Sequence, residues 1–206
     1  MRMKIIVTAG PTREYLDPVR FLSNPSTGKM GFAIAAEAAR RGHAVTLVAG
    51  PVALKTPNRV HRVDVTSARE MLAAVKKAAQ RADILIATAA VADWRPAKCA
   101  AQKLKKSQMS GTLRLVRNPD ILKTVKGVRK IGFAAETNDV LAEAVRTCRE
   151  KRLSFIVAND VTKKGSGFGT DTDKVTFVFP DGTLKFFPLM TKARVAKRIL
   201  DEVSRL

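Results

Sequence analysis

The segment R-F-L-S-N-P-S-T-G-K-M-G combines glycines, hydroxyl side chains and a lysine directly before an alanine-rich helical pattern. Gly28 and Gly31 let the backbone come close to a ligand, because glycine has no side chain to obstruct the approach. Ser26 and Thr27 are residue types that cap helix N-termini. Lys29 would stand in the first helical turn, where the dipole favours an anion, so a lysine there is explained if a phosphate binds. The alternative is an ordinary helix cap with glycines that serve close packing.

The composition is that of one globular domain. The chain of 206 residues is long enough for one sizeable core, and its hydrophobic share of 46% and charged share of 27% are ordinary. The sequence has no apolar run of membrane-spanning length and no cleavable signal pattern, so we expect no membrane partner. Cys99 and Cys148 fit no metal or redox spacing, which makes a reducing cytoplasm the expected compartment.

The chain is strongly basic, with 38 Lys and Arg residues against 18 Asp and Glu residues and a formal net charge of +20. Such a surplus attracts polyanions and raises association rates with anionic ligands. The basic residues are spread over predicted helix faces, and one Trp and one Tyr offer no platform for stacking bases. We therefore expect no specific nucleic-acid partner and assign most of this charge to a solvated surface.

Strand-length apolar runs alternate with helical patterns along most of the chain. Strands are predicted at 3–9, 45–49, 60–64, 83–89, 112–116, 130–135 and 153–158. Helices are predicted at 27–41, 67–81, 119–126 and 138–152. Near-continuous apolar strands between helices are typical of a parallel sheet that is covered on both faces. The predicted fold is a single Rossmann-like α/β domain over residues 1–206, with three layers and a mainly parallel sheet.

The C-terminal part follows a different pattern. The string V-T-F-V-F-P-D-G-T-L-K-F-F contains an Asp-Gly turn at Asp181 and predicts an antiparallel hairpin over residues 173–187. A closing helix is predicted over residues 190–205. Two other segments, 91–111 and 159–172, have no clean periodicity, and loops of such length are functional or disordered.

Distinctive polar strings follow the predicted strands. They are G-P-T-R-E, A-A-V-A-D-W-R-P, N-P-D-I, A-A-E-T-N and A-N-D-V, in chain order. In an open parallel sheet, ligands bind at the carboxyl ends of the strands, where such loops gather. A single string could be a helix cap, but a set of them at one edge predicts a binding site.

Together with S-N-P-S-T-G-K-M-G and K-L-K-K, these strings resemble the phosphopantothenate–cysteine ligase family, in order and over essentially the whole chain. The resemblance implies a CTP-dependent step of coenzyme A biosynthesis. In that reaction the carboxylate of 4′-phosphopantothenate attacks the α-phosphate of CTP and gives an acyl-cytidylate and pyrophosphate. The amine of L-cysteine then displaces CMP to form an amide. This chemistry needs no acid–base pair, which agrees with the lack of a catalytic setting for His43 and His61.

The resemblance also implies catalytic residues. Asn24 matches the asparagine that handles the acyl-cytidylate, and Arg20 matches its partner arginine. An amide donor beside a developing oxyanion, with a guanidinium for the phosphoryl group, suits this chemistry. Lys103, the first lysine of K-L-K-K, matches a lysine on a mobile flap that excludes water, and Ala90 would lie beside the acyl intermediate. The alternative for K-L-K-K is a solvated basic loop.

The nucleotide site implied by the resemblance lies at the strand ends, where backbone groups can recognise a base edge. The residues carried over are Ala87, Thr88, Ala89, Asp93, Lys103, Pro119, Asp120, Ile121, Leu122, Phe133 and Lys151. On physical grounds we add Gly10, Ser26, Gly28 and Lys29 as phosphate contacts. Mg²⁺ is implied by triphosphate chemistry, although no carboxylate cluster in the sequence indicates a metal cage.

The resemblance has departures and further implications. Thr147 stands where relatives carry a nucleotide-contacting lysine, and Arg146 and Arg149 are the candidates to replace it. Most bacterial relatives carry an N-terminal flavin-dependent phosphopantothenoylcysteine decarboxylase domain, so a separate decarboxylase is a further expected partner. Relatives are homodimers. The alternating apolar residues of the 173–187 hairpin predict that its edge pairs with a second chain and helps complete the active site.

Two other functions are compatible with parts of the sequence. A nicotinamide-dependent oxidoreductase shares the architecture, but the first turn lacks G-x-G-x-x-G and the second strand ends in A-G-P instead of an acidic ribose ligand. A nucleic-acid-binding module explains the charge but none of the strings. Thermal-shift measurements with CTP, ATP, NADH and an oligonucleotide discriminate between these functions, because a specific ligand stabilises the native state.

Overall fold

The computed structural model describes residues 2–105, 111–136, 140–160 and 165–206. Within them, the main sheet has the strand order β13-β12-β10-β9-β6-β1-β4-β5. Its parallel strands are β1 (Lys4–Ala9), β4 (Ala44–Ala49), β5 (Val60–Asp64), β6 (Ile84–Ala87), β9 (Arg129–Glu136) and β10 (Phe155–Asp160). The antiparallel strands β12 (Val175–Val178) and β13 (Leu184–Phe186) complete one edge. The predicted mainly parallel sheet with an antiparallel C-terminal hairpin is confirmed.

The central strand β1 marks the point where the topology changes direction. It pairs with β4 on one side and with β6 on the other, so that Thr8 lies opposite both Val48 and Ala87. The chain builds the sheet outward from β1 first on one side and then on the other. The carboxyl ends of β1 and β6 therefore flank a switch point, which is where ligands of open α/β sheets bind.

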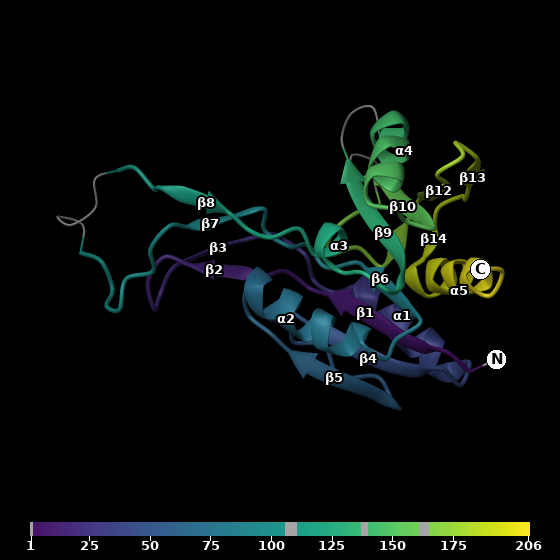
Figure 1. Ribbon diagram of the computed structural model, residues 1–206, viewed down its shortest axis with the longest axis horizontal. Coiled ribbons are helices and arrows are strands. Elements are labelled where there is room, and N and C mark those ends of the chain that lie inside the picture. Colours follow the sequence, from purple (N-terminus) through teal and green to yellow (C-terminus); the bar gives the residue numbers. More distant parts are fainter. Residues whose placement is uncertain (1, 106–110, 137–139, 161–164) are drawn as a thin grey trace.

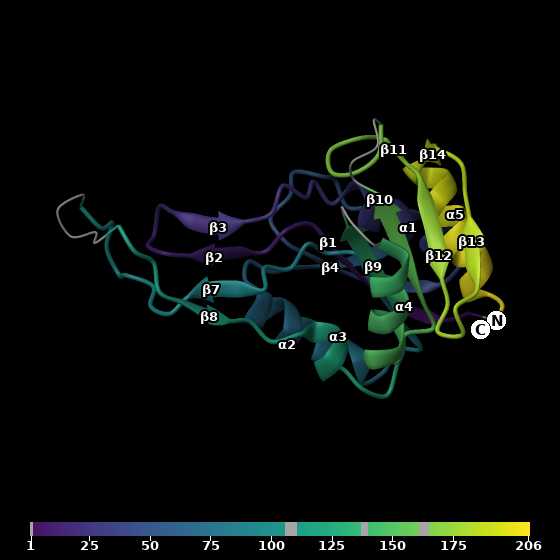
Figure 2. The same cartoon turned by 90° about the horizontal axis from the view of Figure 1, so that it is seen from above.

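Helices cover both faces of the sheet, as Figures 1 and 2 show. Strand alternation explains the layers, because Ile5 and Val7 enter the core beneath one pair of helices while Ile6 enters the core on the opposite face. The first face carries α1 (Lys29–Arg40) and α5 (Lys192–Val203). The other face carries α2 (Ala68–Ala79), α3 (Ile121–Thr124) and α4 (Val140–Glu150).

Local capping sets several helix boundaries. The Ser67 hydroxyl caps α2 by accepting a hydrogen bond from the Glu70 amide, and the Glu70 carboxylate accepts one from the Thr66 amide, which precedes the cap. Thr191 caps α5 by accepting the Arg194 amide. The predicted start of the helix at 138 lies outside the described residues.

The C-terminal hairpin buries one face of its first strand within the chain. Phe177 is fully buried, and its ring packs 5.2 Å from that of Phe155 and 4.7 Å from that of Phe187. On the edge strand, Lys185 pairs with Glu202 of α5, whereas Phe186 is 68% exposed. The pairing of this edge with a second chain stays a prediction. A short antiparallel pair, β11 (Thr172–Asp173) and β14 (Met190–Thr191), connects the segment before β12 to the start of α5.

An arm extends away from the sheet on one side of the molecule (Figures 1 and 2). It contains two antiparallel pairs, β2 (Arg13–Tyr15) with β3 (Phe21–Ser23) and β7 (Trp94–Pro96) with β8 (Leu115–Arg117). We call residues 11–24, 91–105 and 111–118 the arm and the remaining described residues the body. The strand predicted at 112–116 does not belong to the parallel sheet, because Leu115–Arg117 pairs with Trp94–Pro96 in the arm. The string N-P-D-I consequently follows an arm strand.

Candidate active site

A cavity of about 430 Å³ opens at the switch point, beside the start of α1 and the carboxyl ends of β6, β9 and β10. Many of the residues predicted from the sequence line it: Ser26, Gly28, Lys29, Thr88, Ala89, Ala90, Asp93, Leu122, Phe133 and Lys151. Within the described residues, the other predicted positions lie outside this lining: Gly10, Arg20, Asn24, Ala87, Lys103, Pro119, Asp120 and Ile121. The cavity thus unites most of the predicted nucleotide and phosphate contacts but none of the three predicted catalytic residues in its lining.

The start of α1 has no side-chain cap. Gly28 is the N-cap, with a φ of 78° that favours glycine, and no side chain caps the helix. Our expectation that Ser26 or Thr27 caps α1 was therefore wrong; the Ser26 hydroxyl only accepts a long hydrogen bond of 3.4 Å from the Gly28 amide. The first turn also contains no acidic residue. The amides of this turn are left to a ligand of the cavity, for which an anion is the best match.

Glycines bring this helix close to the sheet. A Cβ atom on Gly31 would stand 2.5 Å from the Cβ of Ala9 and 2.6 Å from the hydroxyl of Thr88, which real side chains do not allow. Gly10 adopts a φ of 77° and contacts Gly50 and Val52. Gly10 therefore serves the turn after β1, while Gly31 serves the packing of α1 on β1.

Lys29 lines the cavity but is held by a neighbouring loop. Its ammonium donates to the carboxylate of Asp171 at 2.7 Å and to the carbonyl of Gly169 at 2.9 Å. The ion pair lowers the pKa of Asp171 below its ordinary value of 3.8. Both partners belong to the polar glycine-rich segment that the sequence marked as a functional or disordered loop.

The end of β6 meets the arm at Ala90. The Ala90 amide donates to the Gly10 carbonyl at 2.9 Å, and its carbonyl accepts the Thr12 amide at 3.2 Å and the side-chain amide of Asn24 at 3.1 Å. The structure therefore brings together Asn24 and Ala90, the residues implied to handle the acyl intermediate, at the rim of the cavity. The adjacent Thr88 hydroxyl is fixed by the Thr8 carbonyl at 2.6 Å.

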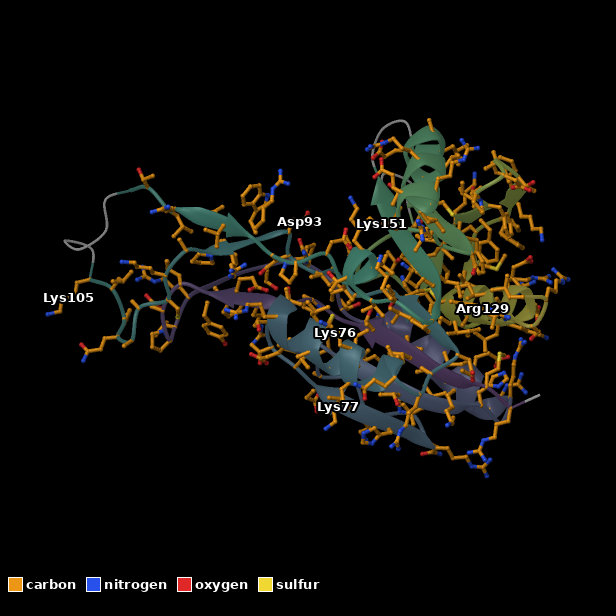
Figure 3. All side chains as sticks on the ribbon, in the orientation of Figure 1. Lys76, Lys77, Asp93, Lys105, Arg129 and Lys151 are labelled. Atoms are coloured by element: carbon orange, nitrogen blue, oxygen red, sulfur yellow. The ribbon has the colours of Figure 1, made fainter. Side chains whose placement is uncertain are left out.

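On the far wall of the cavity, Lys151 forms an ion pair with Asp120, with 2.9 Å between the ammonium and the carboxylate. Asp120 also caps α3 by accepting the Lys123 amide. Burial raises the pKa of Asp120, but that hydrogen bond and Lys151 lower it by more, so the pKa lies below its usual range. Asp120 thereby orients Lys151. Lys151 lines the cavity, whereas Asp120 does not. Figure 3 shows Lys151 on the body beside the base of the arm, where Asp93 lies.

Arg20 and Lys103 occupy the distal part of the arm instead of the cavity. Arg20 donates to the Asp17 carboxylate at 2.5 Å and to the Leu104 carbonyl at 2.9 Å, which fixes Arg20 beside the residue that follows Lys103. Figure 3 places the next lysine, Lys105, at the far end of the arm, well away from Lys151. The Arg20 guanidinium, with the amides of Val19, Arg20 and Leu104, holds the pKa of buried Asp17 well below its ordinary value. One chain alone therefore does not bring Arg20 and Lys103 to the cavity. Lys106, the last lysine of K-L-K-K, lies outside the described residues.

Thr147 lines the cavity, and neither neighbouring arginine replaces the lysine that relatives have there. Arg146 turns toward Glu143 and Glu150 on the exposed face of α4, while Arg149 donates to the Pro180 carbonyl at 2.7 Å. Lys151, one turn later, is the nearest cavity-lining cation on this side of the described structure.

Neither histidine lines the cavity. The Met3 amide donates to the ring of His43 at 3.2 Å, and burial lowers the pKa of His43. His61 is exposed on β5. Among the described residues, no helix is long and apolar enough to cross a membrane.

One wall of the cavity was predicted only in part. It consists of Asn159, Gly167, Phe168, Gly169, Asp173 and Lys192, from the end of β10, the following loop, β11 and α5. The A-N-D-V string included Asn159, and the glycine content marked the loop, but neither reveals that a lysine about twenty residues later on α5 anchors this loop. Val161, in the A-N-D-V string, lies outside the described residues.

The cavity does not form a dedicated magnesium cage. The described residues contain no cluster of three or more potential metal ligands. Two aspartates line the cavity. Asp173 forms an ion pair with Lys192 and accepts the side-chain amide of Asn159, so Asp93, which is exposed, is the one available carboxylate of the two. A lone carboxylate does not fit a resident ion, so we derive no step from bound metal.

Comparison with known proteins identifies the family. The sequence matches the family described as DNA/pantothenate metabolism flavoprotein C-terminal domain over residues 1–206. The chain belongs to this family. The coenzyme A biosynthesis bifunctional protein CoaBC of Escherichia coli is 48% identical over 209 aligned residues, which cover 98% of this chain and 51% of that protein. The chain thus spans about half the length of the relatives it matches.

Solved structures agree with this assignment. The crystal structure of the C-terminal domain of CoaBC has a TM-score of 0.84 and 44% identity, covering 100% of this chain and 97% of that one. A Cab2 mutant in complex with phosphopantothenate-cysteine has a TM-score of 0.78 at 14% identity, covering 98% of this chain and 87% of that one, which supports the fold alone. The family resemblance and the α/β fold inferred from the sequence are confirmed.

Proposed function

We propose that this chain joins 4′-phosphopantothenate to L-cysteine, using CTP and an acyl-cytidylate intermediate. The observation that carries the proposal is the contact between Asn24 and Ala90 at the rim of a cavity that begins at an uncapped helix N-terminus. It places a side-chain amide donor beside a site suited to phosphates. Membership of the family and the similarity to CoaBC support the same activity.

In the first step, a carboxylate oxygen of phosphopantothenate bonds to the α-phosphorus of CTP, and pyrophosphate leaves. The amides at the start of α1 bind phosphate oxygens, and Lys29 exchanges Asp171 for this stronger anionic partner. Phe133 and Leu122 supply apolar contacts for the base, and Lys151 supplies positive charge on the opposite wall.

In the second step, the cysteine nitrogen bonds to the acyl carbon, CMP leaves, and the amine loses a proton to solvent. Charge develops on the acyl oxygen as the nitrogen adds. The Asn24 amide releases the Ala90 carbonyl and donates to that oxygen, because its side chain already donates to the Ala90 carbonyl at 3.1 Å.

We further propose that the enzyme is a homodimer and that the arm contacts the second chain. The arm exposes a set of large apolar side chains: Val19, Phe21, Leu22, Trp94, Leu113 and Leu115. Such a set on a projecting ribbon needs covering by a partner. A second copy reaching across with its arm also brings the missing Arg20 and Lys103 to the cavity of the first. Light scattering tests this arrangement; a monomer with full activity at micromolar concentration contradicts it.

The remaining partners follow from the reaction. CTP enters as a co-substrate and carries Mg²⁺ on its phosphates. The product keeps the cysteine carboxylate, so a separate flavin-dependent phosphopantothenoylcysteine decarboxylase is the expected consumer. We place the reaction in the cytoplasm, because neither cysteine forms a disulfide.

Half-reaction assays test the function. Pyrophosphate release should require both phosphopantothenate and CTP, and later addition of cysteine should yield the amide and CMP. Parallel reactions with ATP, GTP and UTP measure how strictly CTP is chosen. The proposal is wrong if phosphopantothenate elicits no pyrophosphate release from any of these nucleotides in the presence of Mg²⁺.

A further inference from the structure

The ammonium group of Lys192 is enclosed by oxygen atoms beside the cavity. It lies 2.7 Å from the Thr170 carbonyl, 3.0 Å from the Gly167 carbonyl and 3.1 Å from a carboxylate oxygen of Asp173. The Thr170 hydroxyl and the Thr172 carbonyl are further out, at 3.3 and 3.5 Å. Three close acceptors match the three protons of an ammonium group, so the charge is fully satisfied without water.

Lys192 occupies a position that is unfavourable for a cation. It is the first residue of α5, where the helix dipole presents positive charge, and its side chain is only 9% exposed. Asp173, at 4% exposed, supplies the counter-charge. A buried ion pair of this kind adds little stability compared with well-packed apolar residues, so its presence calls for another explanation.

All the oxygens around Lys192 belong to the segment Gly167–Asp173. The same segment presents Gly167, Phe168 and Gly169 to the cavity. Gly167 and Gly169 have φ values of 111° and 79°, which glycine adopts readily, so the segment has little conformational stiffness of its own. Besides the hydrogen bonds of the Thr170 hydroxyl to the Gly167 and Thr172 carbonyls, its shape is set by the ammonium group that its carbonyls surround.

Asp173 links this anchor to the sheet. Its second carboxylate oxygen accepts the side-chain amide of Asn159 at 2.8 Å and the Gly167 amide at 2.8 Å. The Ser166 hydroxyl donates to the side-chain oxygen Oδ1 of Asn159 at 2.5 Å. The anchor is therefore fixed both to the end of β10 and to the start of α5.

We propose that Lys192 is a positioning residue for the nucleotide pocket, acting as a tethered monovalent cation that shapes the Gly167–Gly169 wall. The inference rests on the proposed function only in naming CTP as the ligand. Lys29 holds the same segment from its other side, through Gly169 and Asp171, and is partly exposed. When a phosphate of the ligand binds Lys29, Lys29 no longer holds the segment. The buried anchor at Lys192 then keeps the wall and Phe168 in place over the ligand.

The test is Lys192→Met with measurement of CTP binding by calorimetry and of KM and kcat by pyrophosphate release. Methionine keeps the apolar part of the side chain. It leaves an empty space with the volume of the ammonium group among the same oxygens. We expect CTP to bind about tenfold more weakly, as for loss of a charge-assisted hydrogen-bond group, with KM for CTP rising more than kcat falls. Added ammonium or potassium chloride should restore much of the binding, because either ion can occupy the vacated position.

Lys197→Met is the matched control. It makes the same change on an exposed face of α5, and it should leave CTP binding unchanged and insensitive to ammonium. Tetramethylammonium chloride at the same concentration controls for ionic strength, since that cation is too large for the position. The thermal midpoint of each variant, measured without CTP, reports any general loss of stability.

The outcomes are distinct. Unchanged CTP binding by Lys192→Met overturns the inference. Weaker binding that ammonium and potassium do not restore also overturns it and leaves Lys192 a residue of general stability. If the unsubstituted chain binds phosphopantothenate or another nucleotide but not CTP, the proposed function is wrong while the anchor can still be tested with that nucleotide.

Discussion

The body and the arm bury their apolar residues to opposite extents. In the body, the strands of the sheet carry fully buried side chains such as Leu47, Ile86 and Phe155. In the arm, Phe21, Trp94 and Leu115 are each at least 39% exposed, and the two ribbons have no core between layers of helices. The arm is held instead by polar contacts, of which the largest group surrounds buried Asp17. A short two-stranded ribbon is marginally stable alone, so the arm depends on contacts that the body does not need.

This difference separates the two parts of the site. The cavity is lined mostly by the body of one chain, with Val91 and Asp93 from the base of the arm. The arm carries Arg20 and Lys103, which one chain leaves far from that cavity. Binding of the nucleotide should therefore be a property of the body, and completion of the reaction a property of the body together with a partner's arm.

The largest expected effect is a difference in stability between equivalent truncations in the two regions. Phe177→Ala removes a fully buried ring and should lower the free energy of unfolding by about 3–5 kcal/mol. Phe21→Ala removes a ring that is 39% exposed, contacting Tyr15 and Arg13, and should cost about 1 kcal/mol or less. Urea unfolding at low protein concentration measures both, and similar losses would show that the arm shares the cooperative core.

The next effect concerns the junction between the two regions. Asn24→Asp replaces the amide that donates to Ala90 with a carboxylate that repels the acyl-phosphate. We expect the cysteine step to slow by about a hundredfold, while cytidylylation slows much less and acyl-cytidylate accumulates. Rapid-quench measurement of both half-reactions checks this.

The control for that variant is Asn118→Asp. The Asn118 amide donates to the Ala92 carbonyl at 2.8 Å, which is the same kind of contact two residues further along the chain. It should leave the ratio of the two half-reactions unchanged. Equal losses in both half-reactions for Asn24→Asp would make Asn24 a structural residue of the junction.

A smaller effect tests whether the arm acts in the partner's site. Lys103→Gln should lower turnover about tenfold, because it removes a charge-assisted contact to phosphate, with little change in stability. Lys29→Met impairs the cavity of its own chain. If the arm works across the dimer, mixing the two variants should restore up to about a quarter of full activity, since half of the random dimers then contain one intact site. No recovery after exchange of subunits would mean that each arm serves its own chain.

The sequence was informative where local pattern and tertiary structure agree. The apolar runs located the parallel strands of the body, and the strings at their ends located the cavity-lining residues Ser26, Thr88 and Asp93. The arm was missed because its three-residue strands are too short for any periodicity to register. The run at 112–116 therefore had the composition of a sheet strand, although its partner is Trp94–Pro96.

Long-range contacts explain the remaining differences. Nothing in the sequence near Lys192 indicates that its ammonium meets carbonyls of a loop about twenty residues earlier. The alternation of Val175 and Phe177 correctly indicated a strand with one apolar face, but it could not show that α5 and Phe155 already cover that face. Hydrophobic pattern reveals which residues need burial, and only the fold reveals what buries them.

The distal part of the arm should loosen in acid before the body does. Because Arg20 and the surrounding amides lower the pKa of Asp17, its contribution is complete above the ordinary value of 3.8 and is lost as pH falls through the lower folded value. Hydrogen-exchange protection of residues 16–23, corrected for the intrinsic rate at each pH, should therefore fall severalfold below pH 4, and Asp17→Asn should show lower protection at neutral pH. Asp181→Asn, in the exposed turn of the C-terminal hairpin, controls for general charge effects. If the arm keeps its hydrogen-exchange protection in acid as well as the body does, the arm does not loosen first and the prediction is wrong.

The smallest effect compares the reactivity of two thiols, one in each region. Cys99 is exposed in the arm, whereas Cys148 is buried in α4, where burial raises its pKa to about 11. A thiol reagent at pH 8 should therefore modify Cys99 quickly and Cys148 only when the body unfolds, because the thiolate is the reactive form. Cys99→Ser should abolish the fast reaction. The slow reaction should accelerate in Phe177→Ala but not in Phe21→Ala, since only the first lowers the stability of the body. A slow phase that responds to Phe21→Ala would show that the arm contributes to the cooperative unit that protects Cys148.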